Sequence, residues 1–100
     1  MTDSRTITRV KPTTNLKEPG MYNVLYINDE VTSMEFVMNS LISVFRHSPE
    51  VAEEITMNVH TAGSAVVATL PFEMAEQKGV EVTQMARSNG FPLVIKLEPA

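Results

Sequence analysis

The spacing of apolar and polar residues predicts six short elements after residue 20. Residues 21–28, "MYNVLYIN", are dominated by β-branched and aromatic side chains, which predicts a strand covered on one face. Tyr22, Val24 and Tyr26 would lie on one face, and Leu25 and Ile27 on the other. From Met34 to Arg46 apolar residues recur every three or four positions, a spacing typical of a helix with one broad buried face. Thr32 or Ser33 is the expected N-cap of that helix.

The second half of the chain predicts two more helices and two more strands. A helix is expected from Pro49 to about Thr61, with Gly63 as its C-terminal stop. The β-branched run "SAVVATL", residues 64–70, predicts a strand. A third helix is expected over residues 71–90, and "FPLVIKLE", residues 91–98, predicts the last strand.

The order β-α-α-β-α-β predicts an α+β fold. We expect a small two-layer α/β sandwich of three largely antiparallel strands with three helices. Gly79 lies inside the third helix and costs roughly 1 kcal/mol relative to Ala there, so a bend or close packing is expected at this position. Residues 1–20 are polar and interrupted by Pro12 and Pro19, which predicts a flexible N-terminal tail before a core domain of residues 21–100.

Composition narrows the classes of function. One hundred residues suggest one domain, and a net charge of −4 is unfavourable for binding nucleic acid but compatible with a cationic ligand. The absence of cysteine excludes disulfides, thiol nucleophiles and thiolate zinc sites. No apolar run approaches the ~20 residues that span a bilayer, and no signal-peptide pattern is present. We therefore expect a cytoplasmic protein that does not enter membranes.

Polar side chains end the first predicted strand. Asn28, Asp29 and Glu30 could hold a metal together with His60, serve acid–base catalysis, cap a helix or bind a cation. No spaced ligand motif and no G-x-S-x-G elbow occurs in the sequence. Taken singly, each residue is most simply structural. A small metal- or ligand-binding enzyme using Asp29, Glu30 and His60 stays an alternative.

Several spaced motifs together resemble the ClpS family of adaptors for Clp AAA+ proteases. The resemblance lies in "MYNVLYINDEVTSMEFV", in the "VH" of Val59 and His60, in "FEMAEQK" and in "ARSNGFPLVIKLE". These motifs follow the family order and spacing over roughly residues 19–98. Family proteins capture substrates of the N-degron pathway, or N-end rule, whose first residue is bulky and apolar, and deliver them to a Clp unfoldase.

The resemblance implies a non-enzymatic adaptor without a cofactor or metal. We expect a monomer whose partners are a ClpA-type unfoldase and proteins or peptides that begin with Leu, Phe, Tyr or Trp. The tail would engage the unfoldase during delivery. A regulator that docks the unfoldase without reading N-terminal residues is a second alternative.

The resemblance also implies roles for individual residues. The substrate's α-amino group would be bound by Asn28, Glu30 and His60, with Asp29 adding negative charge nearby. Unfoldase docking would involve three residues, namely Glu73, Glu76 and Lys78. Eight residues would line the cavity for the first side chain: Tyr26, Ile27, Thr32, Met34, Val37, Thr56, Val59 and Leu93.

Four positions depart from the family pattern. Glu30 replaces an Asp, Ser33 a Pro, Thr56 a Met and Phe91 a His. Glu30 is one methylene longer, and Thr56 makes one wall of the cavity smaller and more polar. These changes affect the ranking of Leu against the aromatic residues more than the function itself.

Overall fold

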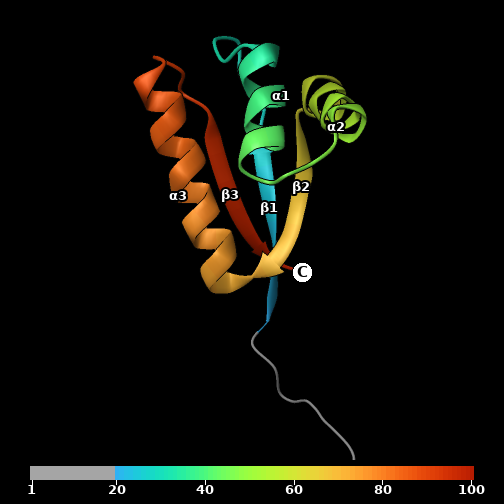
Figure 1. Ribbon diagram of the computed structural model, residues 1–100, viewed down its shortest axis with the longest axis vertical. Helices are drawn as coiled ribbons and strands as arrows, with labels where there is room; N and C mark the ends of the chain where they lie inside the picture. Colours follow the sequence, from blue (N-terminus) through green and yellow to red (C-terminus); the bar gives the residue numbers. More distant parts are fainter. Residues whose placement is uncertain (1–19) are drawn as a thin grey trace, which may run out of the picture.

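The computed structural model describes residues 20–100, in which three helices cover one face of an antiparallel sheet (Figure 1). The strands are β1 (Met21–Ile27), β2 (Ser64–Pro71) and β3 (Val94–Pro99), in the order β2-β1-β3. The helices are α1 (Met34–Ser43), α2 (Pro49–Ala62) and α3 (Phe72–Ser88). The predicted two-layer fold and its element order are confirmed. Nearly all of the predicted tail lies outside the described residues, and the division into tail and core stays a prediction.

The central strand β1 supplies the middle of the core. Val24 and Tyr26 are completely buried beneath the helices. The Tyr26 hydroxyl lies 2.7 Å from Ser40 Oγ, which donates to the carbonyl of Val37 at 2.8 Å. Burial raises the pKa of Tyr26 far above its ordinary value, an effect that the hydrogen bond to Ser40 only partly offsets. Tyr26 is therefore a neutral, fully packed side chain that joins β1 to α1.

The helix caps confirm the boundaries that depend on local chemistry. Ser33, rather than Thr32, caps α1 by accepting a hydrogen bond from the Phe36 amide at 3.0 Å. Gly63 ends α2 in the left-handed conformation, with φ of 90°.

Two boundaries lie three residues from their predicted positions. The helix α1 ends at Ser43, and Arg46 then adopts a positive φ of 63° that turns the chain towards α2. The strand β3 begins at Val94, because the three residues before it form a loop after α3. The expectation that the first helix reaches Arg46 and that the last strand starts at Phe91 was therefore wrong.

Close packing at Gly79 is confirmed, whereas α3 continues through this position without interruption. A Cβ atom at Gly79 would lie 3.5 Å from Ile95 Cγ2 on β3. The helix backbone at Gly79 therefore lies close to the edge strand, at a distance where a Cβ would make an ordinary van der Waals contact with Ile95.

Candidate functional site

The end of β1 lies beside the end of α2. The amide of Asn28 donates to the carbonyl of Gly63 at 2.9 Å, and His60 lies in the last turn of α2, three residues before this glycine. Asn28, Glu30 and His60 are all exposed. One backbone hydrogen bond thus brings the two sequence segments that carry these three residues to the same end of the sheet.

Asp29 organises the turn that follows β1. Its Oδ1 accepts hydrogen bonds from the amides of Val31 at 2.8 Å and Thr32 at 2.7 Å, and its Oδ2 accepts one from Thr32 Oγ1 at 2.8 Å. Desolvation raises the pKa of Asp29, but these hydrogen bonds and the positive charge of Arg87 outweigh it and lower the pKa below its ordinary value. Asp29 therefore remains a carboxylate and holds the turn of residues 29–32, in which Glu30 lies.

Arg87 was not identified as a candidate from the sequence. It nevertheless holds the loop before β3, which lies at this same end of the sheet. Its Nη1 donates to the carbonyls of Phe91 at 2.9 Å and Leu93 at 3.0 Å. These bonds hold the loop that carries Leu93, one of the predicted cavity residues. Position in the last turn of a helix, just before a Gly-Phe-Pro loop, is the one sequence signal that could have indicated this role.

The structure distributes the eight predicted cavity residues between the core and the surface. Ile27 and Thr32 are half-buried, and Met34 is 41% exposed. The other five are at most 5% exposed: Tyr26, Val37, Thr56, Val59 and Leu93. A ligand side chain that entered here would pass the three more accessible residues first.

The hydroxyl of Thr56 is already hydrogen-bonded within its own helix. Thr56 Oγ1 donates to the carbonyl of Ala52 at 2.7 Å, and the residue is buried. Because its proton is used internally, Thr56 adds less polarity to this region than its residue type suggests.

The three predicted docking residues lie around the first half of α3. Glu73 and Glu76 are one turn apart and exposed. Lys78 is half-buried, and its Nζ donates to the carbonyl of Val44 at 3.0 Å, at the carboxyl end of α1. Whereas Lys78 contacts α1, Glu76 lies on the side of β3 and lines a cavity together with Leu97. Glu76 and Lys78 thus flank the exposed side of the helix.

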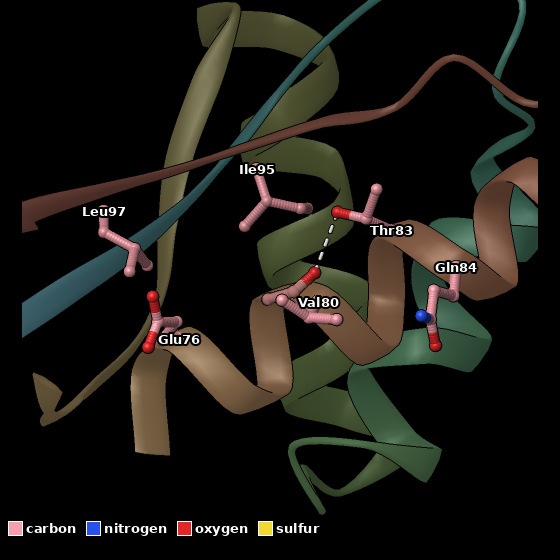
Figure 2. Close-up of a pocket in the computed structure, with 7 residues that line it drawn as sticks. Glu76, Val80, Thr83, Gln84, Ile95 and Leu97 are labelled. Carbon is pink, nitrogen blue, oxygen red and sulfur yellow. Dashed lines mark hydrogen bonds between the residues drawn. The ribbon is translucent and has the colours of Figure 1, made fainter. Parts of the chain in front are cut away.

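Two cavities lie away from the predicted ammonium site. The first, of about 270 Å³, lies between α3 and β3 (Figure 2). The second, of about 240 Å³, is lined partly by Phe36 of α1 and by Phe91, whose rings are in contact with their centroids 5.3 Å apart. Within residues 20–100, no three His, Asp or Glu side chains are grouped so that they could hold a metal ion. No helix in this same range is long and apolar enough to cross a membrane.

The comparisons with known proteins agree with the resemblance noted in the sequence. A family model described as ATP-dependent Clp protease adaptor protein ClpS matches residues 17–96. The chain is 40% identical over 91 residues to ATP-dependent Clp protease adapter protein ClpS 2 of Agrobacterium fabrum, which covers 91% of this chain and 86% of the relative. It is 36% identical over 95 residues to the ClpS adapter of Acetivibrio thermocellus, covering 95% of this chain and 96% of that protein.

A solved structure is similar to this chain in both its fold and its amino-acid sequence. Agrobacterium tumefaciens ClpS2, bound to L-phenylalaninamide, matches with a TM-score of 0.80 and 38% identity, covering 83% of this chain and 100% of the other. ClpS proteins are adaptors rather than enzymes. The matched residues, the identity over most of both chains and the shared fold show that this protein belongs to the ClpS family of ATP-dependent Clp protease adaptor proteins.

Proposed function

We propose that this protein binds substrates through a bulky hydrophobic first residue, such as Leu, Phe, Tyr or Trp, and delivers them to a Clp AAA+ unfoldase of the ClpA type. The observation that carries the proposal is the ligand of the similar ClpS2 structure, L-phenylalaninamide. This molecule has a free α-amine, an aromatic side chain and an amide at the position of the next peptide bond. It is therefore a minimal copy of a peptide's first residue.

The exposed polar groups at the end of β1 and α2 suit the amine. A peptide's free α-amine is an ammonium at neutral pH with three donors, since its ordinary pKa is near 8. Asn28, Glu30 and His60 offer an amide oxygen, a carboxylate and an imidazole nitrogen as acceptors. Each hydrogen bond to a charged group contributes roughly 1.5–3 kcal/mol. The carboxylate of Asp29, which already accepts hydrogen bonds within its own turn, adds negative charge without binding the amine directly.

The first side chain supplies the apolar half of recognition. Its burial contributes about 1.5–3 kcal/mol. It would enter beside Met34 and reach the packed residues Val37, Val59 and Leu93, so that neighbouring side chains must move to admit it. Lys or Arg at the first position would place a charge among apolar groups, which is costly. Met34, at the more accessible rim, would oppose side chains branched at Cβ.

Calorimetric titration tests this proposal. A peptide that begins with Phe or Leu should bind, and the same peptide with Gly added before that residue should not. His60→Ala and Glu30→Ala should each weaken binding about tenfold or more, which is one charge-assisted hydrogen bond. The matched control is Glu53→Ala, an exposed acid elsewhere on α2 that should leave affinity unchanged. Equal affinity for the peptide and its Gly-extended form would instead support a regulator that does not read N-terminal residues.

The docking surface on α3 gives a separate prediction. Glu73→Ala should reduce association with a ClpA-type unfoldase severalfold while leaving peptide affinity unchanged, because Glu73 is exposed and far along α3 from the end of β1. Lys78→Ala should also reduce association, but its loss leaves the carbonyl of Val44 without its lysine partner. A melting curve must therefore accompany the Lys78 variant. Full association of Glu73→Ala in a pull-down would remove this residue from the docking surface.

A further inference from the structure

An apolar groove runs between α3 and the edge strand β3. Ile95 and Leu97 extend from β3 towards the helix, where Glu76, Val80 and Thr83 lie (Figure 2). The two β3 residues pair with Tyr26 and Val24 and so lie on the sheet face that the helices cover. Tyr26 and Val24 are completely buried, whereas Ile95 and Leu97 are only partly so. The helix layer therefore leaves the face of the edge strand incompletely covered.

Position 79, which has no side chain, forms part of the groove lining. Gly79 is buried, whereas Val80 on the same lining is 52% exposed. The hydroxyl of Thr83 does not make the groove polar, because its proton is donated to the carbonyl of Gly79 at 2.8 Å. The charged group on the lining is Glu76, at the end nearest Leu97. An occupant should therefore combine a branched or aliphatic side chain with a neighbouring cation.

The N-terminal segment of the same chain has this chemistry. Residues 5–11, "RTITRVK", combine Ile7 and Val10 with three basic residues. Across the chain the charges are unequally divided. Residues 1–20 hold four of the eight basic and two of the twelve acidic residues, whereas residues 21–100 hold four basic and ten acidic ones. A basic segment and an acidic core attract each other at ordinary salt concentrations.

The position where this segment joins the core also favours the groove. The strand β1 begins at Met21, whose carbonyl accepts a hydrogen bond from the Ala100 amide at 2.9 Å, so β1 starts beside the end of β3. Leu97 pairs with Val24, three residues along β1, which is about 10 Å from Met21. The ten residue steps from Lys11 to Met21 can span up to about 33 Å when extended. Residues 5–11 can therefore reach the groove and turn back into it.

We propose that residues 5–11 dock in cis in the groove between α3 and β3, with Ile7 or Val10 against Val80 and Ile95 and the basic residues beside Glu76. The docked segment would cover Glu76, which belongs to the proposed unfoldase surface. An unfoldase and the tail would then compete for this part of α3. That consequence rests on the proposed function, whereas the docking itself does not.

Paramagnetic relaxation in the full chain tests the docking without an unfoldase. The chain has no cysteine, so Thr8→Cys provides a single site for a nitroxide label. The amide signals of Val80, Thr83 and Ile95 should lose most of their intensity, more than signals on α2 do. The effect should disappear with Glu76→Lys, which reverses an exposed charge, and persist with Glu53→Lys, its matched control on α2.

Two further measurements decide among occupants. Gly79→Leu, which adds a side chain to the groove lining, should also restore the signals of Val80 and Ile95. Because Glu76→Lys changes only an exposed side chain, the test remains valid if the Gly79 variant fails to fold. Unaffected groove signals, or an effect that survives Glu76→Lys, would overturn the proposal. The second measurement mixes isotope-labelled protein that has no nitroxide with unlabelled protein that carries the nitroxide. Loss of groove signals in this mixture would show binding by a second copy and would overturn docking in cis.

Discussion

Acetylation of the α-amine of a peptide that begins with Phe should weaken its binding to this protein at least about 100-fold. Acetylation removes the positive charge and two donors, while the aromatic side chain is unchanged. Loss of two charge-assisted hydrogen bonds, at roughly 1.5–3 kcal/mol each, corresponds to about this factor or more. Fluorescence anisotropy with a label at the peptide's C-terminus measures both affinities under one condition.

The matched control for acetylation separates charge from bulk. A peptide with an N-methylated first residue keeps its positive charge and two donors, and it should lose less affinity than the acetylated one. His60→Ala and Glu30→Ala should reduce the difference between free and acetylated peptide, because part of the ammonium site is then missing. Equal affinity of the free and acetylated peptides for the wild-type protein would refute the ammonium site and leave the apolar contacts alone to explain binding.

Leu41→Ala should lower the free energy of unfolding by about 2–5 kcal/mol, as buried leucine truncations do. Leu41 is completely buried in the last turn of α1 and belongs to the cluster of core residues formed by the helices and the sheet. Since small domains are stable by only about 5–15 kcal/mol, this change removes a large part of the total stability. Urea unfolding followed by circular dichroism measures the midpoint and the slope.

An exposed truncation is the control for Leu41. Val31→Ala removes apolar atoms from a residue that is 60% exposed and should change the unfolding free energy by less than about 0.5 kcal/mol. If Leu41→Ala unfolded at the same urea concentration as Val31→Ala, the packing of α1 against the sheet would be wrong as described.

The sequence determined the elements because local physics decides them. The 3–4 spacing after Met34 and the caps at Ser33 and Gly63 each act within one or two helical turns. The polar stretch at Asn28–Glu30 and the residue His60 were likewise predictable as candidates, although the joint role proposed for them came from the family resemblance. Physical reasoning on single residues left metal binding, catalysis and cation binding open.

The tertiary structure alone decided contacts between residues far apart in the chain. Periodicity cannot show that Arg87 holds the loop at Leu93, or that Lys78 caps α1 at Val44, because each bond depends on how the helices are placed on the sheet. The same placement puts Gly79, an unfavourable residue within a helix, on the lining of a groove beside Ile95. Local sequence fixes which elements form, whereas their packing fixes which side chains meet, since packing energy depends on distances that only the folded chain defines.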